Sequence, residues 1–354
     1  MNVIPPLTIT DAMLTSSTAV ETAPAAYNGA TTYALNATVS VAGSAGLLTV
    51  YQSLQNSNTG HTPASSPAWW TSIGETYQAY SGAATYADGD RVIDATNHLV
   101  YESVVNGNTG NALTDTTKWL KVGPTNKWAM FDLLRNTATV QPSSITVVIT
   151  PGVRVDSIAL LGLVANSATI TVASGGVTVY THTEDLNTRD VANWYDYFFR
   201  AFSTRSSLAL FDLPPYTNAV ITVTITATSG NAQCGACVIG SYEYIGDVQY
   251  DAESDVLNFS TVTRNFDGTT NTSTMVQRLN VPKTIQQIWL DKSRINRVRE
   301  LRDTLNATPA VWAGIDNSDD EYFEALLILG FYKRFSINLR YPQHAVISLE
   351  LEEI

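Results

Sequence analysis

The chain has 354 residues, of which 44% are hydrophobic and 15% charged, and its formal net charge is −12. This length predicts two or three domains, and the hydrophobic share is large enough for well-packed cores, which excludes a mainly disordered chain. The acidic balance, with no Lys or Arg before Arg91, argues against nucleic acid as a partner, because phosphate binding needs cations.

Residues 1–26 form a segment rich in Pro, Ser and Thr. They do not combine a basic region, an apolar core and a small-residue cleavage site, so no signal peptide is expected. No run of about 18 apolar residues occurs in the sequence, so no membrane insertion is expected either. We predict that this segment is an extended arm, which runs over a neighbouring surface or into the unit that follows.

An internal repeat follows the arm. Aromatic, polar and glycine positions recur at an offset of 53 residues, then 50, then 49, as small loop insertions or deletions in a duplicated unit would produce. The matched positions are Tyr27, Tyr33 and Val39 with Tyr80, Tyr86 and Val92; Tyr51, Ser53, Asn56, Asn58, Thr59 and Gly60 with Tyr101, Ser103, Asn106, Asn108, Thr109 and Gly110; and Trp70 and Gly74 with Trp119 and Gly123. We predict two small β modules, residues 27–74 and 80–123, each with two hairpin strands and a buried closing tryptophan.

The pattern of aromatic, tyrosine, Gly-Asp-x-Val turn, second tyrosine and closing tryptophan resembles the chitin-binding type-3 carbohydrate-binding modules. These occur beside chitinase domains and in phage virion proteins. The second repeat is the closer match, because its turn Gly89-Asp90-Arg91-Val92 is intact, whereas Asn36-Ala37-Thr38-Val39 stands in the first. Members of that family usually carry exposed sugar-stacking aromatics after the second strand. Here these places read Leu54-Gln55 and Val104-Val105, so the scaffold carries over but the chitin-binding surface does not.

The resemblance still implies that the repeats touch a host surface, through a glycan or a protein. The candidate contact residues are the tyrosines Tyr33, Tyr51, Tyr86 and Tyr101.

Both cysteines lie in the stretch Cys234-Gly-Ala-Cys237. This spacing fits a redox or metal-binding dithiol, or two small buried residues on a strand with Gly235 permitting a close approach. A redox motif should open a helix after a strand, but this one continues into Val238-Ile239-Gly240. The four histidines are also far apart in the sequence, so further metal ligands are lacking. We favour the structural interpretation and predict no metal and no cofactor.

Residues 126–354 are expected to form a β-rich structural domain. Short apolar runs separated by turn residues predict a β-sandwich of jelly-roll type. The clearest run is 219–228, where Ile221, Val223 and Ile225 alternate with threonines. One helix, a C-terminal α+β segment and the two modules complete a mainly β fold.

Five aromatic residues occur between Trp194 and Phe199. Trp194, Tyr195 and Tyr197 would suit a sugar-binding surface or a protein-binding hot spot. A run of this kind is more often the cap of a sandwich core, and that is the interpretation we favour.

The C-terminal part combines a polar segment, a helix and two strands. Residues 258–281 predict a long surface arm or a hairpin around a turn at 266–271. Two strands, 323–340 and 345–350, join at 341–343, and their outward residues would suit an intersubunit sheet. The stretch 316–321 is acidic, but its sixth position is Glu321 rather than Gly, so it fails the helix-loop-helix calcium pattern.

The predicted helix has apolar residues at helical spacing, Ile295, Val298, Leu301 and Leu305, with Asp291 or Ser293 as its cap. Its cations, Lys292, Arg294, Arg297, Arg299 and Arg302, predict either a docking face for another subunit or a solvated face with internal ion pairs.

The sequence contains no nucleophile elbow, phosphate-binding loop or zinc-binding histidine pair. We therefore predict no catalytic residues. The order of the parts after residue 126 resembles tail or baseplate proteins of phages that infect Gram-negative bacteria. That resemblance implies a non-catalytic structural subunit of the tail tip, baseplate or fibre-attachment region. Such a protein would assemble into a virion in the host cytoplasm, as a homo-oligomer bound to other tail subunits.

Two alternatives remain. A polysaccharide-degrading enzyme would need a pair of carboxylates in a groove. An accessory carbohydrate-binding protein would need exposed aromatics on the repeats and an export signal.

Overall fold

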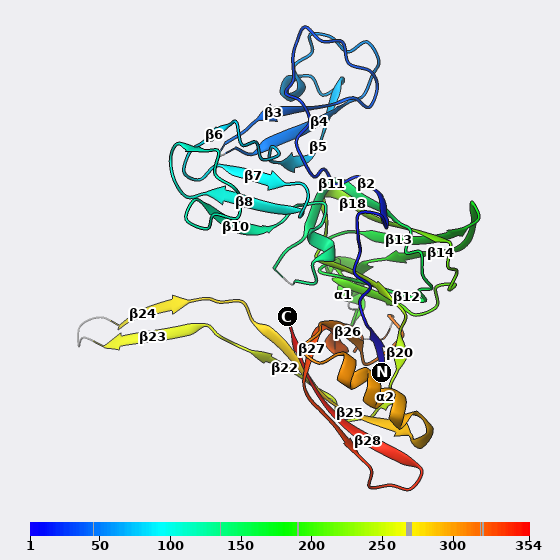
Figure 1. The fold of residues 1–354 in the computed structure, drawn as a ribbon. Coiled ribbons are helices and arrows are strands. Elements are labelled where there is room, and N and C mark those ends of the chain that lie inside the picture. Colours follow the sequence, from blue (N-terminus) through cyan, green and yellow to red (C-terminus); the bar gives the residue numbers. More distant parts are fainter. Residues whose placement is uncertain (45, 135, 190, 267–270, 319, 321) are drawn as a thin grey trace.

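The computed structural model describes residues 1–354 except 45, 135, 190, 267–270, 319 and 321. The fold is mainly β, as predicted, with antiparallel strand pairs throughout its sheets. The two modules lie at one end of the molecule, a β-sandwich lies in the middle, and a large sheet that carries the C-terminus lies at the other end (Figure 1).

Each module is a three-stranded antiparallel sheet. The first contains β3 (Thr38–Ala42), β4 (Leu48–Ser53) and β5 (Trp70–Thr76), with the 3-10 turn η1 (Pro63–Ser65); the second contains β7 (Arg91–Asp94), β8 (Leu99–Ser103) and β10 (Trp119–Pro124), with the short pair β6 (Thr85–Tyr86) and β9 (Asn108–Thr109). The modules thus have one strand more than the predicted hairpin, because the closing tryptophan begins a third strand instead of following the second as a plug.

The two modules repeat the same hydrogen bonds. The Tyr33 hydroxyl accepts a bond from the Asn28 amide at 2.8 Å, and in the second module Tyr86 accepts one from Ser81 at 2.8 Å. The Nδ2 atoms of Asn58 and Asn108 donate to a serine hydroxyl at 2.9 and 3.0 Å. The two modules therefore share hydrogen bonds as well as residue spacings.

A sandwich of two sheets follows, in the orders β14-β13-β18-β11-β2 and β17-β12-β19. The strands are β2 (Leu14–Ser17), β11 (Thr139–Ile149), β13 (Ser167–Ser174), β14 (Val177–Asp185) and β18 (Ala219–Cys234), and β12 (Ser157–Leu161), β17 (Ser207–Leu210) and β19 (Ala236–Gly240); η2 (Ala129–Phe131) leads into them. The alternating Ile221, Val223 and Ile225 of β18 are buried between the two sheets.

The smaller sandwich sheet is buried on both faces. One face packs against the five-stranded sheet through Ile158 and Leu160. The other packs against the C-terminal sheet through Ala159, Ala209 and Val238. Because no face of these strands meets water, their sequences are continuous runs of small apolar residues instead of alternating ones. Residues 126–354 consequently stack as successive layers.

The C-terminal sheet has the order β20-β1-β26-β27-β28-β25-β21, and β22 also pairs with β25. Its strands are β1 (Asn2–Ile4), β20 (Glu243–Tyr244), β21 (Asp247–Val248), β22 (Glu253–Leu257), β25 (Val281–Asp291), β26 (Ala310–Ala313), β27 (Leu327–Asn338) and β28 (His344–Glu353), with η4 (Glu324–Leu326) before β27. The predicted pair of terminal strands is present. β28 is hydrogen-bonded to β25 on one side and to β27 on the other, whereas β27 pairs with β26 only over Leu327–Gly330. The intersubunit sheet expected from the outward residues of these two strands stays a prediction.

The predicted helix is α2 (Ile295–Thr304), preceded by the 3-10 turn η3 (Lys292–Arg294). Asp291 caps this turn by accepting a bond from the Ser293 amide at 2.8 Å. Val298 is fully buried in the core of the C-terminal sheet, with Ile295 and Leu301 packed beside it.

The N-terminal arm contacts the C-terminal sheet, the sandwich and both modules. Its first residues form β1, which lies between β20 and β26 in the C-terminal sheet. The Leu7 amide then bonds to the Ile239 carbonyl, and β2 pairs with β11 of the sandwich. Finally, Thr22 bridges to Tyr77, directly after β5, and Ala26 bridges to Ser40 of β3. The arm is extended and runs over neighbouring surfaces, as predicted, but it also completes a sheet that the sequence did not indicate.

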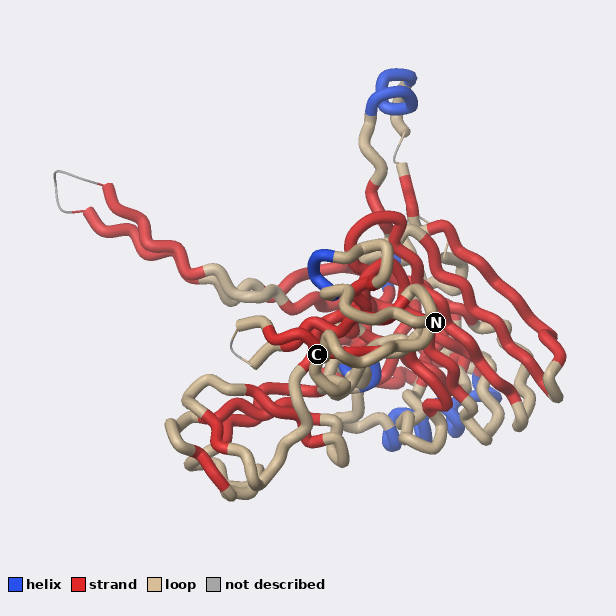
Figure 2. Tube along the Cα trace, turned by 90° about the horizontal axis from the view of Figure 1, so that it is seen from above, coloured by secondary structure: helices blue, strands red, loops and turns tan. Residues whose placement is uncertain are grey.

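Two elements project from this body. The strands β23 (Thr261–Phe266) and β24 (Asn271–Val276) form a long hairpin, which agrees with the arm or hairpin predicted for this segment (Figure 1). The helix α1 (Trp194–Phe199) lies at the end of a stalk whose strands are β15 (Asn187–Thr188) and β16 (Ser203–Thr204) (Figure 2).

Candidate interaction surfaces

The candidate tyrosines of the modules are half-buried, and two of them belong to internal aromatic clusters. Tyr33 stacks beside Tyr27 with ring centroids 5.9 Å apart and meets Trp70 edge-on at 5.2 Å. The second module repeats this triad with Tyr80, Tyr86 and Trp119, where Tyr86 lies 6.2 Å from Tyr80 and 5.3 Å from Trp119.

Both closing tryptophans, Trp70 and Trp119, are only 2% exposed, as predicted for core residues. Tyr51 and Tyr101 lie on the middle strands β4 and β8 and are half-buried. The structure does not gather the four tyrosines on one surface, and their role as contact residues stays a prediction.

The first module carries an aromatic pair that sequence analysis missed. The rings of His61 and Trp69 stack at 3.8 Å with an interplanar angle of 10°. The second module has Asn111 and Lys118 at the matching positions, so this pair is specific to the first. The Trp69-Trp70 doublet could have indicated this pair, since only one of two neighbouring tryptophans on a strand can point into the core.

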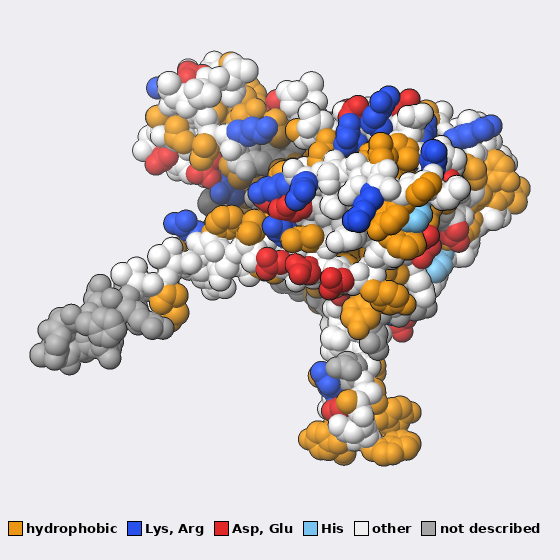
Figure 3. Space-filling view, turned by 90° about the horizontal axis from the view of Figure 1, so that it is seen from below, with side chains coloured by type: hydrophobic (Ala, Val, Ile, Leu, Met, Phe, Trp, Pro, Cys, Tyr) orange, Lys and Arg blue, Asp and Glu red, His pale blue; other side chains and the backbone are white. Residues whose placement is uncertain are grey.

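The aromatic residues of α1 are exposed to solvent, so the favoured interpretation of this run as a sandwich cap is wrong. Six aromatic residues on the helix and its stalk each expose 54–78% of their surface: Trp194, Tyr195, Tyr197, Phe198, Phe199 and Phe202. They form an apolar cluster at the end of the projection (Figure 3). We call these six residues the aromatic tip.

Local interactions explain why a helix forms at this position. The Asn193 side chain caps it by accepting a bond from the Asp196 amide at 3.0 Å. On the stalk, the Arg189 guanidinium lies 4.1 Å from the centroid of the Phe202 ring and donates to the Tyr197 carbonyl. The helix is thus shaped by its own polar residues and holds its aromatic rings away from the body.

The cations of α2 and its leading turn divide into paired and unpaired groups. Arg297 forms an ion pair with Glu243 of β20, and Arg302 pairs with Asp303 at 2.9 Å. Arg294 lies over the Tyr244 ring at 5.2 Å. Lys292 and Arg299 are exposed and have no ion pair among the described residues. Two of the five cations are therefore in ion pairs and a third contacts a ring, and the docking role of this face stays a prediction.

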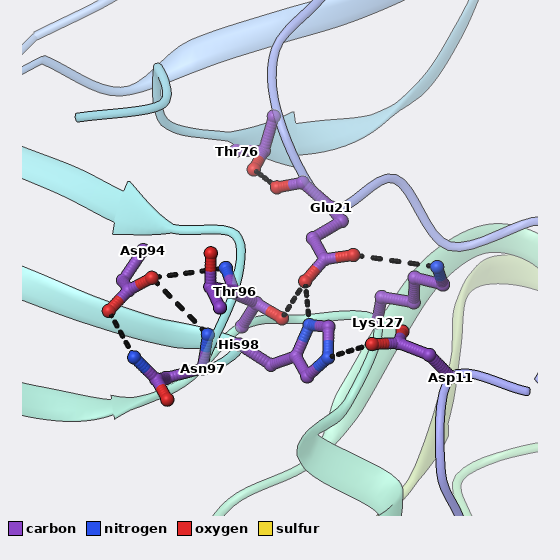
Figure 4. Close-up of polar contacts among 9 residues, drawn as sticks. Asp11, Glu21, Thr76, Asp94, Thr96, Asn97, His98 and Lys127 are labelled. Atoms are coloured by element: carbon purple, nitrogen blue, oxygen red, sulfur yellow. Dashed lines mark hydrogen bonds and ion pairs between the residues drawn. The ribbon is translucent and has the colours of Figure 1, made fainter. Parts of the chain in front are cut away.

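A polar cluster joins the arm, the second module and the start of the sandwich (Figure 4). The His98 ring lies between two carboxylates of the arm, with Nδ1 at 2.6 Å from Glu21 and Nε2 at 3.1 Å from Asp11. Glu21 also meets Lys127 Nζ at 3.4 Å and the Thr125 hydroxyl at 3.3 Å. We call these residues the His98 cluster.

The two cysteines are buried and free, at the end of β18 and within β19. Burial raises the pKa of the Cys237 thiol to about 12, and burial together with Cys237 raises that of Cys234 well above its usual value. A Cβ on Gly235 would lie 3.1 Å from the Leu161 carbonyl oxygen, so the close backbone approach expected there is present. Thiols this buried and this weakly acidic do not suit redox exchange.

An open groove with a volume of about 930 Å³ lies where the sandwich meets the C-terminal sheet. Asp156, Asp212, Glu243 and Asp316 line it. Burial and a hydrogen bond to Asp212 raise the pKa of Tyr180 beside it. Within the described residues, no three His, Cys, Asp or Glu side chains gather as a metal site would require; the predicted acidic stretch 316–321 lies partly outside those residues.

No family model, no curated protein and no solved structure matches this chain. Among the helices that the structure describes, none has the length and apolar content needed to span a bilayer.

Proposed function

We propose that the chain is a non-catalytic structural subunit of a larger particle, the tail tip, baseplate or fibre-attachment region of a tailed phage. The kind of particle is suggested by the sequence resemblance alone. The role as a subunit is supported by one structural observation, the aromatic tip, which holds six large apolar side chains in solvent.

The size of this apolar surface supports an assembly role. The six side chains are on average about two thirds exposed, and an aromatic side chain has about 200 Å² to bury, so the tip offers roughly 800 Å². The largest apolar patch on a typical monomer is about 300–600 Å². A standard protein interface buries about 800 Å² on each partner. The tip is therefore large enough to anchor a stable contact on its own.

The β23–β24 hairpin supports the same role. Its described flanks expose Phe259, Val262, Met275 and Leu279 by 52–75% of their surface. A hairpin of two strands with exposed apolar residues gains little stability by itself, so a neighbouring subunit is its natural support. The exposed Lys292 of η3 and Arg299 of α2 would guide an acidic partner into register more than they would strengthen the contact.

The aromatic tip provides the test. Replacing Trp194, Phe198 and Phe199 with serine should abolish incorporation into particles, or self-association in analytical ultracentrifugation, while the circular dichroism spectrum stays unchanged. The matched control is Val177→Ser, which removes an apolar side chain that is 65% exposed on the sandwich and should assemble normally. A triple variant that assembles as well as this control would contradict the proposal.

A polysaccharide-degrading enzyme is the second candidate, and the carboxylate-lined groove is the observation in its favour. Asp156 and Asp212 would be the first residues to test, because a glycosidase needs two carboxyl groups facing one bond. Release of reducing ends from host-surface polysaccharide that is lost in Asp212→Asn, with particle assembly unchanged, would support this candidate over the structural one.

A further inference from the structure

The His98 ring is held by an acceptor on each of its two nitrogens. Nδ1 lies 2.6 Å from Oε1 of Glu21, and Nε2 lies 3.1 Å from Oδ2 of Asp11. A neutral imidazole carries one N–H, and only the protonated ring has a donor on both nitrogens. The observed arrangement is therefore satisfied in full only when His98 is protonated.

Loss of that proton turns one of the two contacts from an attraction into a repulsion. A neutral ring can keep its bond to one carboxylate, but its other nitrogen then turns a lone pair toward the second carboxylate. The arm and the second module would be held by one bond and opposed by one repulsion. The protonation of this one ring therefore decides whether both contacts are favourable or only one.

The charged groups around the ring come from three parts of the chain. Asp11 and Glu21 belong to the arm, and Asp94 lies on the module close enough to sense the charge of His98. Lys127 meets Glu21 from the linker, residues 125–128 between β10 and η2, and Asp132 lines the same surface pocket as His98. Of these four carboxylates, only Glu21 and Asp11 contact the ring, because Asp94 and Asp132 accept hydrogen bonds from residues near them in the chain.

The cluster also lies at a joint between parts. His98 stacks on Trp128 at the entrance to the sandwich with ring centroids 4.1 Å apart, and its carbonyl accepts a bond from the Thr125 amide at 2.8 Å. The Glu21 carbonyl accepts a further bond from Thr76, at the end of the first module. One ring therefore contacts the arm, the linker and the sandwich, and its partner Glu21 reaches both modules (Figure 4).

We propose that His98, Glu21 and Asp11 form a proton-dependent latch, which holds the second module against the sandwich when the ring is protonated and loosens it when the ring is neutral. This inference does not depend on the proposed function, since it concerns the orientation of the modules alone.

Energy transfer between two dyes tests the latch in the full chain. Thr116 and Thr217 are exposed, one on the second module and one on the sandwich, and cysteines at these positions would accept dyes. The native thiols are buried and should stay unlabelled. We expect one narrow distribution of transfer efficiency at about pH 5, and a broader distribution with lower mean efficiency at about pH 8.

Two variants should respond in opposite ways. His98→Asn removes the imidazole ring, and asparagine tolerates the left-handed backbone at this position, where φ is +58°. This variant should give the broad distribution at both pH values. Asp11→Asn can donate to the neutral ring while Glu21 accepts from it, so it should give the narrow distribution at both. The control is His61→Asn, which introduces the residue found at the matching position of the second module and should respond like the parent.

The outcomes decide the matter. A parent distribution that does not change between the two pH values would overturn the latch. A His98→Asn variant that keeps the full pH response would assign the change to another group and would overturn it equally. Asp11 is largely exposed, with 70% of its side-chain surface in solvent, so Asp11→Asn should fold and remains informative even if His98→Asn does not fold.

Discussion

Replacing Trp119 with alanine should unfold the second module and leave the rest of the protein folded. The indole is 2% exposed, and its Nε1 donates to the Asn111 carbonyl at 3.1 Å. It also meets the rings of Tyr80 and Tyr86 edge-on at 5.7 and 5.3 Å. Truncation of a buried tryptophan to alanine costs about 3–5 kcal/mol, and the lost ring contacts fall within that range.

This loss is comparable to the whole stability of so small a unit. Folded proteins gain about 0.05–0.15 kcal/mol per residue, which for the 80–123 module is about 2–7 kcal/mol. Small domains are also marginal because little of their surface is buried. The sandwich has its own core and does not include Trp119, so it should survive the change.

Hydrogen–deuterium exchange read by mass spectrometry can separate these effects. Peptides within 80–123 should lose protection in Trp119→Ala, while those within 139–240 keep it. The control is Leu120→Ala on the same strand, where the side chain is 55% exposed and protection should not change. Retained protection of the module, or loss of protection across the whole chain, would refute the reasoning.

Three further predictions follow from the remaining features. Burial raises the thiol pKa values of Cys234 and Cys237, so the free energy of unfolding should fall by about 1 kcal/mol per thiol for each pH unit above about pH 9. The urea midpoint should therefore fall less with rising pH in the double alanine variant than in the parent. Deleting residues 27–123 should leave the sandwich folded and assembling, because Glu21 already touches Thr125, and should reduce adsorption to host cells; normal adsorption would make the modules purely structural. Arg297→Glu should lower the urea midpoint by opposing Glu243, whereas Arg299→Glu should leave it unchanged and weaken docking to an acidic partner; equal midpoints for the two variants would contradict this assignment.

The parts of the fold that depend on local pattern were predictable from the sequence. The repeat was visible as three residue offsets, and the structure carries it as matched hydrogen bonds in the two modules. The alternation in 219–228 indicated a half-buried strand, and the spacing of Ile295, Val298 and Leu301 indicated the helix α2. In each case neighbouring residues alone determine which face is apolar.

The parts that depend on distant partners were not predictable. The N-terminal residues 2–4 are too few to reveal that they form a strand, and their partners Val311, Trp312 and Ala313 lie near the other end of the chain. The aromatic run at 194–199 is ordinarily a sign of burial, and only the position of the stalk shows that nothing in the described chain covers it. The His98 cluster joins residues that are 77 and 87 positions apart, with no shared motif.

The placement of β1 also determines when this protein can finish folding. Val3 pairs with Trp312, so the ribosome must add roughly 300 more residues before the pairing is possible, which takes about 15–60 s at 5–20 residues per second. The modules, whose contacts are local, can form long before that. Until β26 emerges, the apolar β1 segment can pair only with β20, and its other edge is exposed to aggregation. Slow release from the ribosome, or a chaperone that holds the first residues, should therefore raise the yield of folded protein more than any change within the modules.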